Sequence, residues 1–509
     1  MKRTLTLAPA LLVLLTASWS AAADFVPLFD GKTLTGWKQL GGKAKYEVVE
    51  DAIVGTSVPD TPNSFLCTEK DYANFVLEME VMVDSRLNSG IQFRSESKAD
   101  YQNGRVHGLQ FELDPSDRAW TGGIYEEGRR GWLNNLEAND RARYAFKRDA
   151  WNRVRIEANG ELLRTFLNGV PAGELKDSMT PKGFIALQVH GVGKETTPMS
   201  VKWRNIRILE NPEPGDLTPV AKKPEVEPAA VPADAKVELI QSGFKFTEGP
   251  ALALDGRIFF TDIPNNRIHI YDPAGGQISV HRENSQGANG LMFTPTGALL
   301  ACEGTAGQLT RQIGTDEPVP LAKELNGTRY NAPNDLDLDG KGGIYFTDPN
   351  YRKEPPAQDK EGVYYIATGK GNAQGAKVTR VIDDCVRPNG IIVSLDKKSL
   401  YVADNGANKV RIYDIDAKTG ACTNGRDFAK MEEGQARGGD GMTIDERGNL
   451  YVTAQKWIWV FSPDGKTIAK IEVPENPANC IFGAHGTQTL YITARTGFYK
   501  VKLAVDGRR

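Results

Sequence analysis

Six short stretches in the C-terminal half of the chain each place an oxygen-bearing side chain at the start of a short β-rich segment. These residues are Glu248, Asn289, Asn334, Asn389, Asp440 and Asn479. Carboxylate and amide oxygens are the ligands that Ca²⁺, Mg²⁺ and Mn²⁺ prefer. Asn and Asp also begin strands simply as turn formers, so one such residue indicates little. Six oxygen donors, two of them charged, predict a site for a hard cation if the six segments meet at one axis.

The segments that carry these residues repeat along the chain. Each continues into a Gly-containing turn and an apolar strand, as in Phe259-Phe260-Thr261-Asp262, Tyr345-Phe346-Thr347-Asp348 and Tyr401-Val402-Ala403-Asp404. The six positions lie 41, 45, 55, 51 and 39 residues apart. A four-stranded propeller blade takes about 40–50 residues. We therefore predict a six-bladed β-propeller over 237–509, in which residues 237–240 add the outer strand of the last blade.

Residues 24–209 show a different β pattern, with short alternating segments and no long helical period. We expect a two-sheet sandwich. Alternation directs one set of side chains to the core: Phe93, Phe111, Leu113, Ile185, Leu187 and Val189. It directs a polar set to the opposite faces: Gln92, Arg94, Gln110, Glu112, Asp114, Gln188 and His190. That set suits hydrogen bonding to sugar hydroxyls, and a solvated sheet face is the alternative.

The ends and connections of these two domains predict an exported protein. Residues 1–23 have the charged, apolar and small-residue order of a secretory signal, and a membrane anchor is less favoured because the apolar run is short. Residues 210–236 contain six prolines among Glu, Lys and Ala, which is typical of an extended linker. The five cysteines are widely spaced without a C-x-x-C motif, and we expect mostly buried free thiols. We therefore expect a periplasmic or secreted location.

Composition excludes several function classes. The formal net charge is −3 and no Lys/Arg block occurs, which argues against nucleic acid as a partner. Beyond the N-terminus no apolar run is long enough to span a membrane. The chain has no G-x-S-x-G, H-E-x-x-H or Walker motif. We expect a monomer that acts on a small molecule.

The N-terminal half resembles the 3-keto-disaccharide hydrolase family over nearly all of 25–209. The resemblance is carried by the stretch from Phe29 to Trp37, by Asn88-Ser89-Gly90-Ile91-Gln92-Phe93-Arg94 and by residues 108–114. It implies a concanavalin-like jelly roll that binds or cleaves 3-keto-glycosides. We carry over no catalytic residue from the family. On chemistry alone, Glu112 or His190 is a candidate for the general base. Arg94 is a candidate for stabilising an enolate, and Gln110 is a further candidate on the same polar face.

The C-terminal half resembles the regucalcin/gluconolactonase (senescence marker protein) family from about 240 to 503. Four motifs occur in order: Thr247-Glu248-Gly249-Pro250, Ala332-Pro333-Asn334-Asp335, Arg387-Pro388-Asn389-Gly390 and Gly439-Asp440-Gly441-Met442. The resemblance implies metal ligands at Glu248, Asn389 and Asp440, a substrate-contacting amide at Asn334, and Asp440 as general base. Animal members carry an Arg where this chain has Ala332. Arg329 and Arg387 are candidates to replace it.

Together these observations predict an all-β protein, a jelly-roll β-sandwich followed by a six-bladed β-propeller. We expect an exported, metal-dependent sugar lactonase whose sandwich cleaves 3-keto-glycosides or binds carbohydrate. The expected cofactor is a divalent cation, Ca²⁺ first, with Mg²⁺, Mn²⁺ and Zn²⁺ as alternatives. The expected substrate is a small sugar lactone or an oxidised oligosaccharide. Two alternatives are a non-catalytic carbohydrate-binding protein with a structural metal, and a metal-dependent esterase acting on non-sugar substrates.

Overall fold

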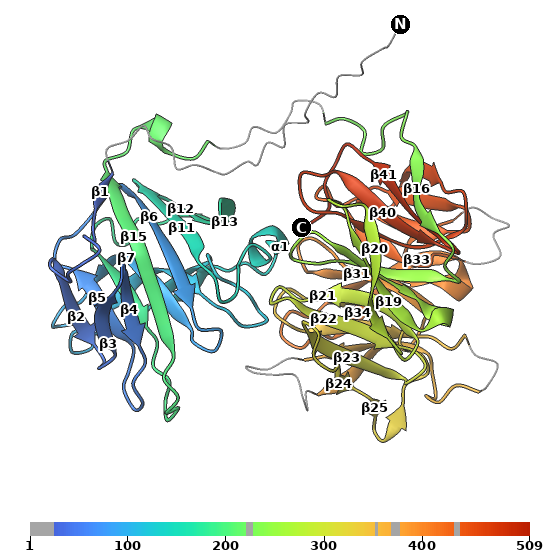
Figure 1. Ribbon diagram of the computed structural model, residues 1–509, viewed down its shortest axis with the longest axis horizontal. Coiled ribbons are helices and arrows are strands. Elements are labelled where there is room, and N and C mark those ends of the chain that lie inside the picture. The colour runs from blue at the N-terminus through green and yellow to red at the C-terminus, as the bar shows by residue number, and fades with distance from the viewer. Residues whose placement is uncertain (1–24, 220–226, 352–354, 368–376, 432–437) are drawn as a thin grey trace, which may run out of the picture.

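The computed structural model describes residues 25–219, 227–351, 355–367, 377–431 and 438–509. A sandwich and a propeller lie side by side, and the C-terminus ends between them (Figure 1). The predicted signal segment, 1–23, lies outside the described residues. Within those residues no helix combines the length and the apolar character needed to cross a membrane.

The N-terminal domain consists of two antiparallel sheets that face each other. One sheet orders its strands as β13 (Val170–Lys176), β12 (Leu162–Leu167), β11 (Asn152–Asn159), β6 (Phe75–Val83), β15 (Ser200–Glu210), β4 (Ala52–Thr56) and β3 (Lys45–Val49), with β1 (Val26–Pro27) paired to β15. The other orders them as β10 (Gly131–Asn134), β9 (Ile124–Glu127), β8 (His107–Leu113), β7 (Ser89–Glu96), β14 (Phe184–Val189), β5 (Ser64–Thr68) and β2 (Trp37–Gly41). The sandwich is confirmed, and all six predicted core residues belong to its main apolar cluster.

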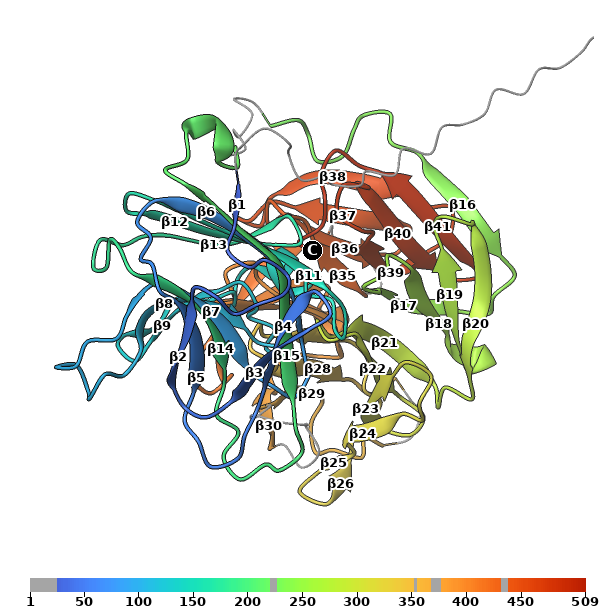
Figure 2. The same cartoon turned by 60° about the vertical axis from the view of Figure 1, so that its left-hand side comes forward.

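Six four-stranded antiparallel sheets form the C-terminal domain, and Figure 2 shows them arranged around a common centre. From the inner strand outward, the first three are β17 (Thr247–Leu252), β18 (Ile258–Asp262), β19 (Arg267–Asp272), β20 (Gln277–Glu283); β21 (Ala288–Phe293), β22 (Ala298–Glu303), β23 (Gln308–Ile313), β24 (Val319–Ala322); and β27 (Leu336–Leu338), β28 (Ile344–Asp348), β29 (Gly362–Ile366), β30 (Val378–Ile382). The short hairpin β25 (Glu324–Leu325)–β26 (Thr328–Arg329) precedes the third blade.

The last three blades are β31 (Pro388–Val393), β32 (Ser399–Asp404), β33 (Lys409–Ile415), β34 (Cys422–Lys430); β35 (Met442–Ile444), β36 (Leu450–Ala454), β37 (Trp457–Phe461), β38 (Thr467–Glu472); and β39 (Pro477–Phe482), β40 (Thr489–Ala494), β41 (Gly497–Lys502), β16 (Val237–Ser242). Strand β16 pairs with β41, so the first strand of the domain completes the last blade, as predicted. This pairing closes the ring and leaves no open blade.

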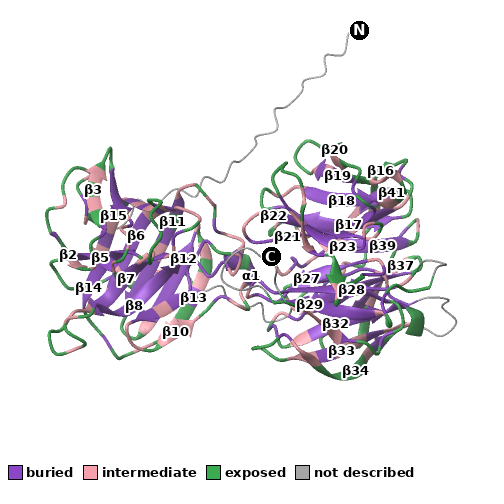
Figure 3. Cartoon of the chain, turned by 90° about the horizontal axis from the view of Figure 1, so that it is seen from below, coloured by how far each residue is buried: buried purple, intermediate pink, exposed green. Residues whose placement is uncertain are grey.

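Buried residues lie in the interior of each domain (Figure 3), and the apolar clusters of the sandwich and of the propeller are separate. In the propeller, apolar clusters connect neighbouring blades; one, for example, joins Tyr345 and Val363 of the third blade to Val402 of the fourth. All five cysteines are free, and all but Cys422 are buried. Part of the predicted linker packs instead of only spacing the domains: Ala230 belongs to the apolar cluster of the last blades and its carbonyl accepts from Ala504 N at 3.0 Å.

The two domains meet at the short helix α1 (Asp140–Arg143) of the sandwich. The propeller side of this interface lies where the inner strands end, opposite the strand starts that carry Glu248 and Asp440. Trp120 Nε1 donates to Gly340 O at 3.1 Å, and Tyr144 OH donates to Phe293 O at 2.9 Å. The sandwich therefore covers one end of the propeller axis, and the end with the predicted cation ligands faces away from it.

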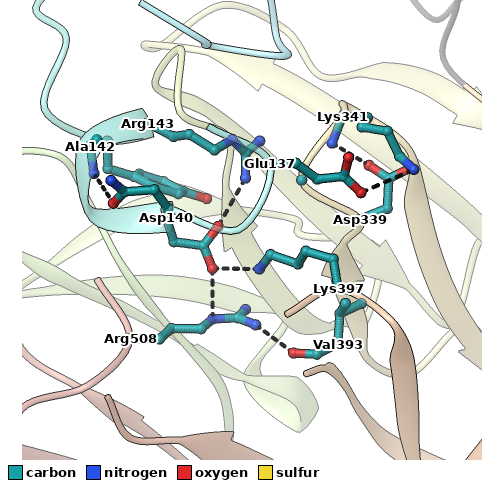
Figure 4. A network of polar contacts seen from close by, with 12 residues as sticks. Glu137, Asp140, Ala142, Arg143, Asp339, Lys341, Val393, Lys397 and Arg508 are labelled. Atoms are coloured by element: carbon teal, nitrogen blue, oxygen red, sulfur yellow. Dashed lines mark hydrogen bonds and ion pairs between the residues drawn. The ribbon is translucent and has the colours of Figure 1, made fainter. Parts of the chain in front are cut away.

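A buried ion network lies at the centre of this interface (Figure 4). Asp140 accepts from Lys397 Nζ at 2.6 Å and from Arg143 Nη1 at 2.9 Å. Arg508, next to the C-terminus, lies 3.8 Å from Asp140 and donates to Asp337 at 2.9 Å. Burial alone would raise the pKa of Asp140, but the three cations hold it below its ordinary value. Each buried charge of the network thus has a partner of opposite charge, and Lys397 and Arg508 link Asp140 of the sandwich to the propeller and its C-terminal tail.

Candidate active site

The close approach of neighbouring inner strands places the predicted ligands around one mouth of the propeller. Gly290 N donates to Asn334 O at 2.7 Å, and Gly390 N donates to Asp440 O at 2.9 Å. A Cβ on Gly390 would lie 2.3 Å from Asp440 O, and one on Gly249 would lie 1.9 Å from Asn289 O. Glycine after the oxygen-bearing residue therefore lets the strands meet at the axis.

A repeated buried threonine on the second strand of the blade fixes several of these inner strands. Thr347 Oγ1 donates to Asn389 O at 2.8 Å, and Thr261 Oγ1 donates to Asn289 O at 3.2 Å. A repeated carboxylate follows it: Asp348 accepts from Asn331 N and Ala332 N at 2.9 and 2.7 Å. The Thr-Asp pairs visible in the sequence thus have a structural role, which the sequence analysis missed.

Five of the six predicted residues line one cavity of about 840 Å³. They are Glu248, Asn289, Asn334, Asn389 and Asp440. The sixth, Asn479, lies lower on the axis, where it lines a smaller cavity with Asp335. Its amide nitrogen is 3.5 Å from Asp335 Oδ2. The structure therefore places Glu248, Asn389 and Asp440 together with Asn334 at the mouth.

The donor set of this mouth fits a hard cation. Glu248 and Asn389 are buried and Asp440 is half-buried. Burial, reinforced by the nearby Asp440 carboxylate, raises the pKa of Glu248 well above its ordinary value. Across the described part of the chain, no group of three or more His, Cys, Asp and Glu could hold a metal ion. Two carboxylates supplemented by amide oxygens are instead the oxygen-rich set that suits Ca²⁺ or Mg²⁺ more than a soft metal.

Tyr351 is a member of the cavity that sequence reasoning missed. Its hydroxyl accepts a hydrogen bond from Asn389 Nδ2 at 2.8 Å. This contact occupies the nitrogen side of the Asn389 amide and leaves Oδ1 available to a cation. Burial raises the pKa of Tyr351, with the carboxylates of Asp440 and Glu248 acting in the same direction, so the phenol stays neutral. Tyr351 lies in the long connection between β28 and β29, where no repeat pattern marks it.

The two arginines predicted to replace the missing Arg at Ala332 are not among the residues that line the cavity. Arg329 is exposed and donates to Thr305 O at 3.2 Å. The Arg387 guanidinium is also exposed and lies 5.9 Å from the centre of the Tyr351 ring. The cation that does line the mouth is Arg495, in the turn between β40 and β41.

In the sandwich, a buried polar cluster forms around two of the predicted residues. Glu112 accepts from Gln110 Nε2 and Asn88 Nδ2, both at 2.7 Å. Gln92 in turn donates to Gln110 Oε1. Burial raises the pKa of Glu112 to about 7, although both amides favour its ionised form. Gln92, Gln110 and Glu112 are at most 5% exposed, which excludes the alternative of a solvated sheet face here.

Arg94 and His190 do not join this cluster. Arg94 has a φ of 45°, and its strand shifts register between Phe93 and Glu96. The bulge turns the guanidinium toward Ala73 O and Gly160 O, both at 2.7 Å, and away from the face predicted by alternation. His190 follows the end of β14, is exposed, and has Nδ1 2.8 Å from Gly191 O. Its solvated position corrects the prediction that it shares the polar face with Glu112.

Comparison with known proteins identifies both domains. Residues 246–496 match the family model of the SMP-30/Gluconolactonase/LRE-like region. A gluconolactonase of Zymomonas mobilis subsp. mobilis is 30% identical over 303 residues, which are 55% of this chain and 84% of that protein. The chain belongs to the SMP-30/gluconolactonase family. Residues 24–209 match the 3-keto-alpha-glucoside-1,2-lyase-like domain, so this family member carries a second domain.

Two further relatives agree with the assignment. Pentonolactonase XacC of Haloferax volcanii is 26% identical over 265 residues, covering 51% of this chain and 84% of that protein. An X-ray structure of a gluconolactonase candidate is 27% identical with a TM-score of 0.50, covering 55% of this chain and 96% of that one. The SMP-30/gluconolactonase fold thus accounts for the propeller almost end to end.

Proposed function

We propose that the propeller is a divalent-cation-dependent hydrolase of sugar lactones in an exported protein. The observation that carries the proposal is that Glu248, Asn389, Asp440 and Asn334 line one cavity. Relatives named gluconolactonase and pentonolactonase support the reaction class. The signal-like segment at 1–23 supports export. Ca²⁺ is the first candidate, and the oxygen donors of Glu248, Asn389 and Asp440 would hold it.

The residues of the mouth suit the hydrolysis of a cyclic ester. A bound divalent cation would polarise the lactone carbonyl and stabilise the negative charge that develops on its oxygen. Asp440 accepts a proton from the water that attacks the carbonyl carbon. The bond from that carbon to the ring oxygen breaks, and the proton passes to this oxygen, which gives the open-chain hydroxy acid. The Asn334 amide donates to a substrate oxygen and orients the ring.

Removal and return of the cation tests this proposal. We expect the chelated protein to lose hydrolysis of D-glucono-1,5-lactone and to regain it when Ca²⁺ is added, because the carbonyl is not polarised without the ion. Acid release at constant pH measures the rate, with spontaneous hydrolysis subtracted. Mg²⁺, Mn²⁺ and Zn²⁺ are compared at equal free concentration. Equal rates in the chelated and restored protein on several sugar lactones would contradict metal dependence.

For the sandwich, we propose cleavage of 3-keto-glycosides with Glu112 as the base. The buried Glu112 carboxyl, with its pKa raised to about 7, favours this over simple carbohydrate binding. A base with this pKa can be ionised at neutral pH and still be strong enough to remove the acidic proton next to a keto group. The match to the 3-keto-alpha-glucoside-1,2-lyase-like domain supports the substrate class.

The pH dependence of this activity follows from the direction of the shift. Because the base must be deprotonated, kcat/KM for a 3-keto-disaccharide should rise about tenfold per pH unit below about 7 and level off above it. Glu112→Gln should abolish release of the monosaccharide, while Glu47→Gln, on the exposed side of β3, serves as the control. Binding of the disaccharide without release at any pH would reduce the sandwich to a carbohydrate-binding module.

A further inference from the structure

Arg495 holds a defined place at the mouth of the propeller that neither the repeat pattern nor the proposed reaction explains. It occupies the turn between β40 and β41 with a φ of 45°. Its carbonyl accepts from Thr247 N at 2.8 Å. Thr247 directly precedes Glu248, a candidate ligand of the cation. In the neighbouring blade, the corresponding turn places Gln455 at the same cavity. At the end of the second strand, blades one, three and four carry Asp262, Asp348 and Asp404. The fifth and sixth blades carry Ala454 and Ala494 at this position, so their side of the mouth differs from the rest.

The backbone of this turn is fixed on both sides while the guanidinium stays available. Thr496 O accepts from Gly243 N and Phe244 N at 3.1 and 3.2 Å, and Thr496 N donates to Glu475 at 2.9 Å. Glu475 is also the acceptor for Tyr499 OH at 2.8 Å. In the described ranges Arg495 forms no salt bridge, and its guanidinium lies 5.8 Å from the centre of the Phe246 ring. Arg495 is exposed, and its charge acts on the nearby Glu475 carboxylate, which forms no salt bridge with it and already accepts from Thr496 and Tyr499.

The charge of the cavity indicates what such a cation would bind. Among the described residues that line it, only Glu248 and Asp440 are acidic and only Arg495 is basic; the rest are neutral. A divalent cation held by the two carboxylates would balance them. Among the described lining residues, Arg495 would then have no carboxylate left to balance its charge. An anionic group on the substrate would complete the balance, and a planar guanidinium pairs well with a carboxylate.

We propose that Arg495 is a specificity-determining residue that binds a carboxylate of the substrate. The preferred substrates are then sugar lactones that carry a free carboxylate, such as lactones of sugar diacids, over neutral aldonolactones. This inference rests on the proposed lactonase function of the same cavity. It also accounts for Ala332, because the substrate-binding arginine comes from the last blade and not from the third.

The test compares one charged and one neutral lactone. For wild type and Arg495→Gln, kcat/KM is measured for D-glucaro-1,4-lactone and D-glucono-1,5-lactone at equal free Ca²⁺. We expect the ratio of the two values to fall about 10- to 100-fold in Arg495→Gln, since a charge-assisted hydrogen bond contributes about 1.5–3 kcal/mol. Arg495→Lys should keep part of the preference, because it keeps the charge but loses the planar pair of donors. Arg329→Gln is the matched control, an exposed arginine outside the cavity.

A ratio in Arg495→Gln within twofold of wild type, or an equal loss in Arg329→Gln, would overturn the inference. Binding of the open-chain diacid D-glucarate and of D-gluconate, measured by titration calorimetry, provides a readout without turnover. If wild type hydrolyses neither lactone, the proposed lactonase function fails. The calorimetry then decides by itself whether Arg495 binds a carboxylate. Tighter binding of glucarate than gluconate that disappears in Arg495→Gln supports the role of Arg495; equal binding in both proteins refutes it.

Discussion

Asp440→Ala is expected to lower kcat/KM for D-glucono-1,5-lactone by at least about a thousandfold, even with saturating Ca²⁺. Asp440 lines the same cavity as Glu248 and Asn389, and the proposed mechanism gives it two roles. A positioned general base contributes about 10²–10⁴-fold to a rate. The loss of one of two acidic ligands should weaken the cation site as well. Initial rates at constant pH, with free Ca²⁺ varied, separate the two effects.

Two further variants of the mouth separate the base from the ligand. Asp440→Asn keeps an oxygen that can contact a cation but cannot accept the proton, so the rate should stay low when Ca²⁺ is saturating. Glu248→Gln removes a charge but not the base, so its rate should recover in part as Ca²⁺ rises. Asp414→Ala, a half-exposed carboxylate on the fourth blade away from the cavity, is the control. Wild-type rates in both Asp440 variants would show that this cavity is not a lactonase site.

The propeller was predictable because the same sequence pattern recurs in each of its blades. Six segments of similar length each carry an oxygen-bearing residue, and in four of them a glycine follows it directly, as Gly249 and Gly390 do. The structure shows that each such glycine allows one inner strand to approach the next. Only Asn479 departs from the other five, because it lines a smaller cavity below the mouth. A repeat pattern identifies equivalent positions along the strands but not their depth along the axis.

The residues that were missed lie outside the repeats. Tyr351 and Arg495 reach the cavity from connections between strands, and only the closed ring brings those connections together. Arg94 was misplaced for a related reason, since alternation assumes a regular strand and the register shift next to it cannot be read from side-chain types. The domain interface was equally invisible, because four residues of α1 carry no helical period.

Asp140→Ala is expected to loosen the docking of the sandwich on the propeller by about 3–5 kcal/mol. The substitution leaves Lys397 and Arg143 buried at the interface without their shared carboxylate, and breaking one partner of a buried ion pair costs this much. The Lys397 side chain is only 1% exposed, so water cannot replace Asp140 without opening the interface. Hydrogen–deuterium exchange measures the effect, and protection of α1 should fall about a hundredfold or more.

A second charged pair at the same interface provides the matched control for this prediction. Asp117 pairs with Arg311 at 3.0 Å but is 31% exposed, and such a pair contributes about 0–1 kcal/mol. Asp117→Ala should therefore leave the protection of α1 nearly unchanged. The double variant Asp140→Ala with Lys397→Met should be less destabilised than the sum of its single variants, because both remove the same ion pair.

Since the network lies at the far end of the propeller axis from Asp440, lactone hydrolysis should persist in Asp140→Ala. Unchanged exchange at α1 would mean that the packing of Trp120 and Tyr144, and not the buried ions, holds the two domains together.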